Sequence, residues 1–534
     1  MLSRRDLLAA ALAAPALRLP SRRAYDLILR GGTVFDGSGA AGTVADVAVQ
    51  DGRIAAVARS IRATARDEIT AKGLAVAPGF IDIHSHADGS LFEDPRVESV
   101  LRQGVTTIVV GQDGSSRVPG RAGETSFAPL FQRIEALPSA VNVATMVGLG
   151  TVRRVVVGLD DRPATAAELA RMTELVEAAL ASGACGASTG LEYTPGAFAT
   201  REELTALCRP LAARRLPYAT HMRNEDDQLL EAIEESIAIA TGAGCPLQIS
   251  HLKTGGPRNW HKIDAVFARL ARARQEGSDL SFDRYPYVAW ATGLTTRFPV
   301  WARDGGTAAF LKRLDDSATA SRIREETEAD VVQVGGWDKI LLTDVDAPED
   351  RAAVGQRLDA WARTNAMEPY AAALKLLRSN GGSVGTVVFA MSEENCERFL
   401  AHPLAMVCSD GGAYALTGPA HSGHPHPRGL GTFPRVLGRY VRERKALSLA
   451  QAVHKMTGKP AARLRLTDRG RIAAGAAADL VVFDPATIAD QATFEQPFQY
   501  PVGIPAVVVN GAVALRDGER VGRGAGRGLK PPSR

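Results

Sequence analysis

The stretch "PGFIDIHSHADG", residues 78–89, ends a short apolar run with two histidines one residue apart. Side chains alternate between the two faces of a strand, so His84 and His86 point to the same side. Two neutral imidazoles on one face can bind a single transition-metal ion. A hydrogen-bonded structural pair is the alternative, because His424 and His426 also lie one residue apart, in a loop rich in Gly and Pro. Only the first pair follows an apolar run, which makes it the better candidate for a metal site.

The composition is that of a folded protein with a large core. Of 534 residues, 45% are hydrophobic and 23% are charged, and the formal net charge is +4. The basic residues are interleaved with acidic ones, so the sequence gives no support for nucleic-acid binding. The five cysteines form no C-x-x-C pair, and we expect small buried thiols rather than a disulfide framework.

The first 24 residues differ from the rest of the chain. Arg4 and Arg5 precede an apolar stretch, residues 7–17, that is too short to span a bilayer. The S-R-R-x-L-L pattern resembles a twin-arginine export signal, and the alternative is a basic, Ala-rich tail. We therefore expect an exported protein, periplasmic or extracellular, with no later membrane span.

Both ends of the remaining chain have the pattern of short strands joined by tight turns. Asp51-Gly52, Asn510-Gly511 and Asp517-Gly518 each separate two apolar runs, which is a strong signal for a β-hairpin. We expect residues 25–74 and 456–534 to form one small β-sandwich domain together.

Residues 75–455 alternate strand-like apolar runs with helical patterns. Two helix starts, Thr165 with Glu168 and Thr200 with Glu203, fit the capping box. Eight βα repeats predict an α/β fold, a TIM (β/α)8 barrel. Residues 293–382 interrupt the alternation before the last strand and are too long for an ordinary connection, so we expect an inserted subdomain or lid.

Seven polar side chains of metal-ligand type lie at the ends of six of the predicted strands. Barrel active sites lie at the carboxyl ends of the strands, where these side chains would converge. Nitrogen and oxygen donors without cysteine indicate a site for one or two divalent ions. The seven residues are His84, His86, Asp113, Glu192, His221, His251 and Asp410.

From about Tyr25 to its end the chain resembles the amidohydrolase superfamily, and within it the N-acyl-D-amino-acid deacylases (D-aminoacylases). The motifs that carry the resemblance are "PGFIDIHSH", "GASTGLEYTPG", "THMRNE", "QISHLK", "DRYPY", "CSDGG", "PHPRGLGTFPRVLGRYVRE" and "GRIAAGAAADLVVFDP". The resemblance implies a zinc-dependent barrel enzyme with a composite β domain and a small insertion.

One position departs from the family pattern. Where the family ends the second strand with a metal-binding cysteine, this chain has Asp113 in "VVGQDGSS". Relatives bridge two metals with a carboxylated lysine or a glutamate on the fourth strand, where this chain offers Glu192. Our hypothesis is that Glu192, helped or replaced by Asp113, bridges one ion on His84 and His86 and another on His221 and His251. A turn residue and a surface ion pair are the plainer alternatives for the two acids.

The resemblance also implies a reaction. Metal-activated hydroxide would attack a small-molecule amide, with Asp410 as general base and acid. Lys253, Tyr285 and Arg428 would hold the carboxylate of an N-acyl-D-amino acid. A cyclic amidase or dipeptidase of the dihydroorotase, hydantoinase or isoaspartyl type is the second expectation, and a non-catalytic binding barrel is the third. The oligomeric state is left open.

Overall fold

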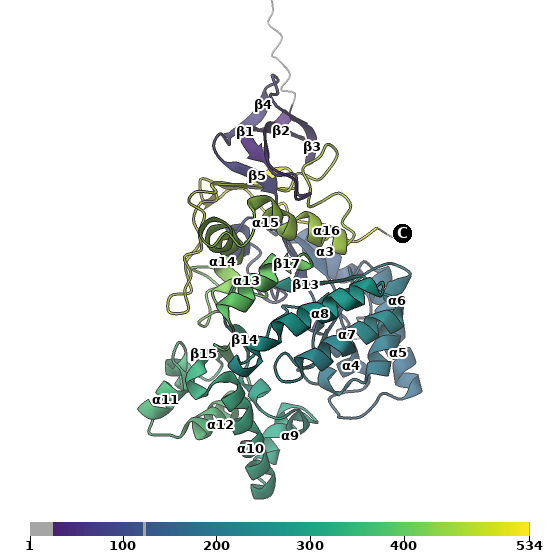
Figure 1. Cartoon of the computed structure of the whole chain (residues 1–534), viewed down its shortest axis with the longest axis vertical. Coiled ribbons are helices and arrows are strands. Elements are labelled where there is room, and N and C mark those ends of the chain that lie inside the picture. Colours follow the sequence, from purple (N-terminus) through teal and green to yellow (C-terminus); the bar gives the residue numbers. More distant parts are fainter. Residues whose placement is uncertain (1–24, 121–123, 533–534) are drawn as a thin grey trace, which may run out of the picture.

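The computed structural model describes residues 25–120 and 124–532. The predicted export signal, residues 1–24, lies outside the described residues. Figure 1 shows three parts stacked along the long axis: a β domain built from both chain ends, a central barrel, and an insertion at the opposite end. None of the helices in the described residues is long and apolar enough to cross a bilayer. All five cysteines are free and buried, as expected from their spacing.

The central part is a closed barrel of eight parallel strands in the described chain. One set of strands pairs in the order β6-β7-β8 and the other in the order β9-β10-β11-β12-β13-β17. β8 and β9 are two pieces of one strand, and a parallel bridge between Ser85 and Gly411 closes the ring. The strands are β6 (Phe80–Asp82), β7 (Val105–Val110), β8 (Asn142–Thr145), β9 (Val147–Gly148), β10 (Ala187–Gly190), β11 (Tyr218–His221), β12 (Leu247–Ile249), β13 (Leu280–Arg284) and β17 (Ala405–Val407).

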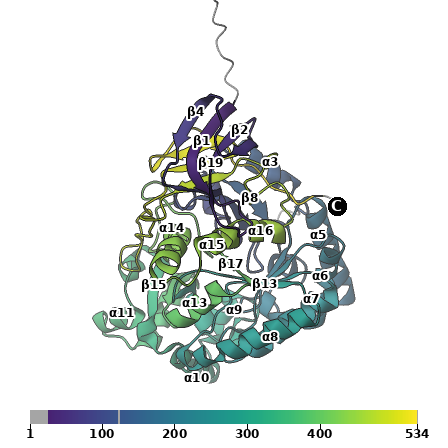
Figure 2. The same cartoon turned by 45° about the horizontal axis from the view of Figure 1, so that its top comes forward.

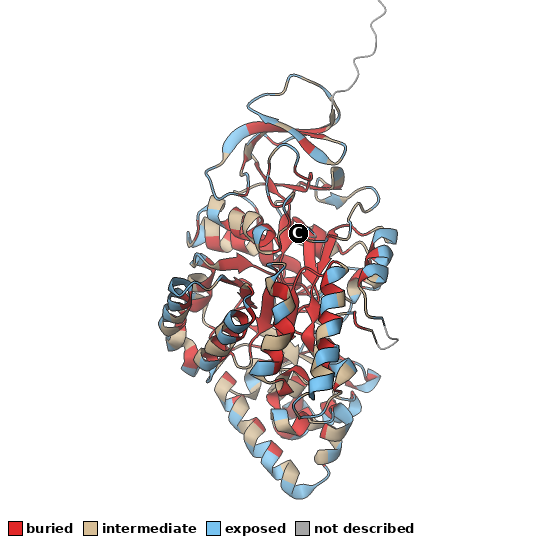
Figure 3. Ribbon diagram, turned by 90° about the vertical axis from the view of Figure 1, so that its right-hand side faces the viewer, coloured by how far each residue is buried: buried red, intermediate tan, exposed pale blue. Residues whose placement is uncertain are grey.

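Helices cover the outside of the barrel, and the buried residues fill the space between helices and strands (Figures 2 and 3). The capping box at Thr165 is present, with Glu168 reaching back to the Thr165 backbone. At Thr200 only half of the predicted box forms, because Glu203 pairs with the buried guanidinium of Arg153 at 3.0 Å instead. The main covering helices are α5 (Ala166–Ala181), α6 (Arg201–Ala212), α7 (Leu229–Ala243), α8 (Ile263–Gln275), α13 (Glu393–Ala401), α14 (Arg428–Arg435), α15 (Leu449–Met456) and α16 (Gly458–Arg463).

The two chain ends share one nine-stranded sheet, in the order β21-β20-β19-β18-β5-β1-β2-β3 with β4 also paired to β1. We expected a small β-sandwich domain from the two chain ends, and the structure contains this separate β domain. Its strands form one continuous hydrogen-bonded sheet because β1 pairs with β4 through residues 25–30 and with β5 through residues 33–34, and the side chains of β1, β2, β18 and β19 share one hydrophobic cluster. The strands are β1 (Tyr25–Val34), β2 (Thr43–Gln50), β3 (Arg53–Ala58), β4 (Ala65–Thr70), β5 (Ala75–Pro78), β18 (Leu480–Phe483), β19 (Ala506–Val509), β20 (Ala512–Arg516) and β21 (Glu519–Arg520).

The insertion between β13 and β17 has a hydrophobic cluster of its own. Its antiparallel sheet has the order β14-β16-β15, and helices α9 to α12 belong to the same insertion (Figure 1). The first strand, β14, lines the cavity described below, so the insertion contributes to the site. Its elements are β14 (Trp290–Gly293), β15 (Ile340–Val345), β16 (Val384–Val388), α9 (Thr307–Arg313), α10 (Ser317–Val334), α11 (Leu358–Thr364) and α12 (Pro369–Ser379).

Candidate metal centre and active site

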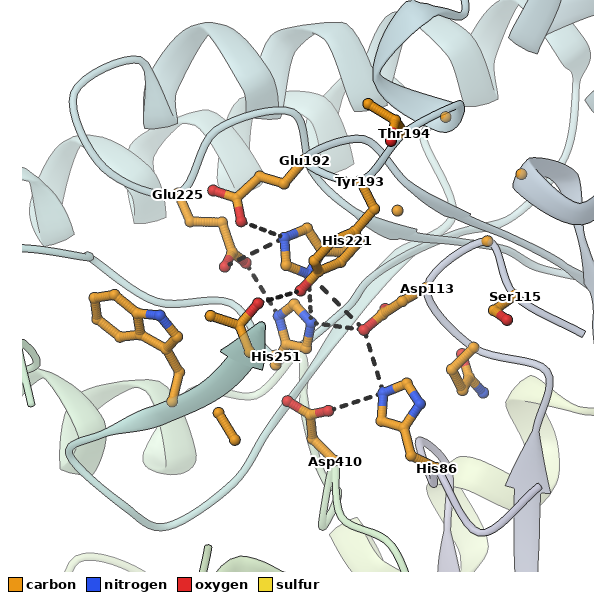
Figure 4. Close-up of a pocket in the computed structure, with 18 of the residues that line it drawn as sticks. His86, Asp113, Ser115, Glu192, Tyr193, Thr194, His221, Glu225, His251 and Asp410 are labelled. Carbon is orange, nitrogen blue, oxygen red and sulfur yellow. Dashed lines mark hydrogen bonds and ion pairs between the residues drawn. The ribbon is translucent and has the colours of Figure 1, made fainter. Parts of the chain in front are cut away.

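The barrel brings the seven predicted metal-site residues to one rim. His221 is the last residue of β11, and the other six follow the carboxyl ends of β6, β7, β10, β12 and β17. In Figure 4 the side chains of His86, Asp113 and Asp410 point toward those of His221 and His251. Backbone hydrogen bonds from Asp410 N to His84 O, 2.9 Å, and from His86 N to Gly411 O, 2.9 Å, fix the first and last strands beside each other. The alternation of strands and helices inferred from the sequence therefore brings these donor side chains together at one end of the barrel.

Four donor atoms meet around the first histidine pair. The Nε2 atoms of His84 and His86 are 3.4 Å apart. Asp113 Oδ2 lies 3.4 Å from the first and 3.3 Å from the second. Asp410 Oδ1 lies 3.5 Å and 3.1 Å from the same two nitrogens. Ligands about 2.0–2.1 Å from a tetrahedral zinc are about 3.3–3.4 Å from one another, so this spacing matches such a shell.

The second histidine pair meets the same oxygen of Asp113. His221 Nδ1 and His251 Nε2 are 3.0 Å apart, and they lie 3.8 Å and 3.5 Å from Asp113 Oδ2. Glu192 Oε2 lies 3.1 Å from His221 Nε2, which is the nitrogen on the other side of that ring. In this arrangement an oxygen of Asp113, and not one of Glu192, lies between the two pairs, which favours the part of our hypothesis in which Asp113 replaces Glu192 as the bridge.

Three of the residues that converge here have backbone conformations that non-glycine residues rarely adopt. The φ angle is +49° at Asp113, +34° at His251 and +50° at Asp410. Each such residue costs of the order of 1–3 kcal/mol, and the surrounding structure must hold it in place. The turns after β7, β12 and β17 therefore direct these side chains into the centre of the barrel mouth.

The donor set fits a divalent cation. Burial favours the neutral acid, yet the imidazoles of His84 and His251 hold the pKa of Asp113 well below its usual range. Burial lowers the pKa of His86, but the carboxylates of Asp113 and Asp410 outweigh it and raise that pKa to about 9. Within the described chain, Asp113 Oδ1 is buried without a hydrogen-bond partner, while His84 Nδ1 lies 3.5 Å from Asp283 Oδ1. Carboxylates and imidazoles crowded in this way have a strong demand for positive charge, which a metal ion satisfies.

Glu225 lies at the metal cluster, although the sequence analysis did not predict it as a site residue. Its Oε1 lies 3.0 Å from His251 Nδ1, which is also 2.7 Å from the ammonium of Lys253, and its Oε2 accepts a hydrogen bond from that ammonium. In the tautomer in which Nδ1 donates to this carboxylate, Nε2 of His251 keeps its lone pair for a metal. The available signal was an acid four residues after His221 in "THMRNE", on the loop that leaves the same rim.

The three predicted substrate-binding residues are buried beside the cluster. Lys253 and Arg428 line a cavity of about 270 Å³ that also exposes Tyr193 and Trp290. Arg428 Nη1 donates to Asp410 Oδ2 at 2.6 Å, so each of the two cations is already paired with an acid. The guanidinium of Arg428 lies 4.8 Å from the ring centre of Tyr285.

Tyr285 does not line this cavity, and its buried hydroxyl has no hydrogen-bond partner among the described residues. The other N–H groups of Arg428 remain free to grip a substrate carboxylate. The structure therefore places Lys253 and Arg428 in the wall of the cavity beside the cluster, whereas Tyr285 contacts Arg428 without lining the cavity.

Comparison with known proteins agrees with this geometry. The amidohydrolase family model matches residues 67–320 and 419–515. A D-aminoacylase from Alcaligenes xylosoxydans xylosoxydans is 38% identical, over 95% of this chain and 97% of that protein. The crystal structure of N-acyl-D-glutamate deacylase from Bordetella bronchiseptica, complexed with zinc and a phosphonate inhibitor, has a TM-score of 0.81 at 35% identity, covering 95% of this chain and 99% of that one.

A structure of D-aminoacylase described for its binuclear metal center has a TM-score of 0.80 at 37% identity, over 95% of this chain and all of that one. Hydantoinase structures, at 19% identity or below and TM-scores up to 0.57, share only the fold. The chain therefore belongs to the amidohydrolase family, in the branch that contains the D-aminoacylases and N-acyl-D-amino-acid deacylases.

Proposed function

We propose that the protein is a metal-dependent hydrolase that removes the acyl group from N-acyl-D-amino acids. The observation that carries the proposal is the meeting of three features in one cavity: the histidine and Asp113 cluster, the carboxylate of Asp410, and the buried cations Lys253 and Arg428. An enzyme that hydrolyses an amide substrate bearing a carboxylate needs both a hydrolytic centre and a fixed positive charge beside that centre. The D-aminoacylase and deacylase relatives support the same substrate class.

One divalent ion would be held by four residues: His84, His86, Asp113 and Asp410. A second ion would be held by His221 and His251 together with the shared Asp113. Zinc is the expected metal. When bound, such an ion polarises a carbonyl oxygen and makes water acidic enough to lose a proton near neutral pH.

Asp410 is placed to move protons. Burial would raise the pKa of its carboxyl, but the guanidinium of Arg428 and the imidazoles of His251 and His84 together hold that pKa below its usual range. Asp410 is therefore ionised near neutral pH, with Oδ2 held by Arg428 and Oδ1 facing His86. It accepts the proton of the attacking water and delivers it to the departing nitrogen, a role that contributes about 100- to 10,000-fold in other enzymes.

A substrate panel tests the proposal. The metal-loaded protein would be assayed on N-acetyl-D-amino acids, their L enantiomers, hydantoins and β-aspartyl dipeptides, before and after treatment with a chelator. We expect hydrolysis of the D series that is lost with the metal and restored by zinc. Activity on rings or β-aspartyl dipeptides alone would select the cyclic amidase or dipeptidase alternative, and no activity at full metal content would select the binding barrel.

We also propose that the protein is exported by a twin-arginine route, which the Arg4-Arg5 pattern supports. The test is cell fractionation of the wild-type chain and of the double variant R4K/R5K. We expect the variant to accumulate in the cytoplasm. A matched control is R22K/R23K, which changes a second arginine pair outside the motif and should leave export intact. Equal export of all three chains would contradict the proposal.

A further inference from the structure

A second cavity, of about 420 Å³, opens at the end of the barrel opposite the metal cluster. Pro246 and Asp279 in its wall directly precede β12 and β13, and Ser281 is the second residue of β13. The metal cluster lies at the carboxyl ends of the same strands. The two cavities share no lining residue in the described parts of the chain. We call this second site the barrel-base cavity.

The barrel-base cavity has an excess of positive charge. Four cationic side chains line it, with Asp279 as the single carboxylate among the described residues: Arg215, Lys459, Arg463 and Arg465. Arg463 Nη2 donates to Asp279 Oδ1 at 2.9 Å, and the side chain of Asp279 is 57% exposed. Among the described residues, the other three cations pair with no carboxylate. Like charges held together in this way leave a potential that favours an anion.

The cations also keep unused hydrogen-bond donors. Lys459 Nζ donates to the carbonyl oxygen of Pro403, and Arg465 Nη1 to that of Arg214. An ammonium has three N–H donors and a guanidinium five, so most donors in the cavity remain free for a ligand. Burial, together with the positive charges of Arg463 and Arg274, lowers the pKa of Lys459 to about 8. No carboxylate offsets this crowding at Lys459.

Ser281 is an independent sign of a ligand. The residue is 2% exposed, and its Oγ is buried without a hydrogen-bond partner in the described structure although the residue lines the cavity. A buried hydroxyl without a partner costs about 1–3 kcal/mol relative to a satisfied one. An anion in the cavity would accept the hydrogen bond that Ser281 does not make within the protein.

We propose that the barrel-base cavity binds a phosphate group, free or as a monoester, held by Lys459, Arg463 and the hydroxyl of Ser281. A dianion matches the surplus of cations better than a single carboxylate does, and its oxygens accept several charge-assisted hydrogen bonds at once. The cavity has room for the phosphate and for part of an attached small alcohol. This site is separate from amide hydrolysis and does not depend on it.

Isothermal titration of the full chain with inorganic phosphate and with glycerol phosphate tests the proposal. Ionic strength is held constant with KCl, and each titration is repeated after the metal is stripped. We expect saturable binding in both forms, weakened about tenfold or more in K459M and several-fold in S281A. K312M is the matched control because it removes the same charge from an exposed position on α9, and it should bind as the wild type does.

Circular dichroism melting without phosphate identifies variants that fail to fold, and either K459M or S281A is sufficient for the test. Tighter binding of glycerol phosphate would identify a monoester as the ligand, and equal binding would identify free phosphate. Heat that does not saturate, or binding that K459M and S281A leave unchanged, would overturn the proposal. Binding that disappears only with the metal would do the same, because the anion would then lie at the metal cluster.

Discussion

Replacement of Glu225 by Gln separates the roles of this buried carboxylate. Glu225 is 8% exposed, and its two oxygens face His251 Nδ1 and the ammonium of Lys253. Loss of a carboxylate that orients a metal-binding histidine typically weakens metal affinity 10- to 100-fold, or about 1.4–2.7 kcal/mol. The same change leaves the Lys253 charge buried without a partner, and breaking a buried pair in this way costs about 3–5 kcal/mol of folding stability.

A second change distinguishes the two losses. In E225Q/K253M the unpaired ammonium is gone, so urea unfolding of the metal-free protein should recover most of the stability lost in E225Q. Zinc affinity, measured by competition with a chromogenic chelator, should stay 10- to 100-fold below the wild type because His251 still lacks its carboxylate. E235Q is the matched control: its partner Arg223 is 33% exposed at the side chain, and zinc affinity should not change. Wild-type zinc affinity in E225Q/K253M would show that the Glu225 carboxylate does not orient His251 for the metal.

Four further substitutions test other residues of the site and of the barrel. D410N should lower kcat about 100- to 10,000-fold with a smaller effect on zinc content. If kcat and zinc content fall by the same factor, Asp410 acts only as a metal ligand and not as a general base. R428M should move the acid limb of the pH profile of kcat/KM to higher pH. Arg428 lowers the pKa of Asp410, so without Arg428 this base loses its proton only at higher pH. An acid limb that does not move would count against the pairing of Arg428 with Asp410. Y285F should leave KM for the N-acyl-D-amino acid nearly unchanged, because the buried Tyr285 hydroxyl does not line the cavity, and a raised KM would show that Tyr285 does reach the substrate. L529A should reduce the free energy of unfolding, measured by urea denaturation, by about 2–5 kcal/mol, because Leu529 is 8% exposed and packs in a hydrophobic cluster inside the barrel. A reduction below about 0.5 kcal/mol would show that the packing of Leu529 contributes little to stability.

The local signals in the sequence predicted local structure well. The turns at Asp51-Gly52, Asn510-Gly511 and Asp517-Gly518 join β2 to β3, β19 to β20 and β20 to β21, and each has both residues at positive φ. The alternation of strand runs also placed His84, His86 and the other donors at one rim, because the carboxyl ends of parallel strands share one side of a barrel.

Features that depend on contacts between distant segments could not be predicted in the same way. The choice between Glu192 and Asp113 depends on a turn after β7 and on which nitrogen of His221 faces inward, and neither leaves a pattern in the sequence. The pairing of Glu225 with His251 and Lys253 joins two loops that follow different strands. The continuity of the sheet in the β domain likewise arises from the division of β1 between two partners.

One oxygen of Asp113 lies between two histidine pairs, and we propose that both pairs hold metal through it. A crystal structure of the zinc-loaded protein, with anomalous data collected at the zinc edge, would show which atoms bind the metal. We predict zinc ligated by Asp113 Oδ2, either between His84 and His86, between His221 and His251, or at both places. Zinc bound by Glu192 and His221 Nε2 with Asp113 outside ligand distance, or no zinc at this rim, would contradict the account.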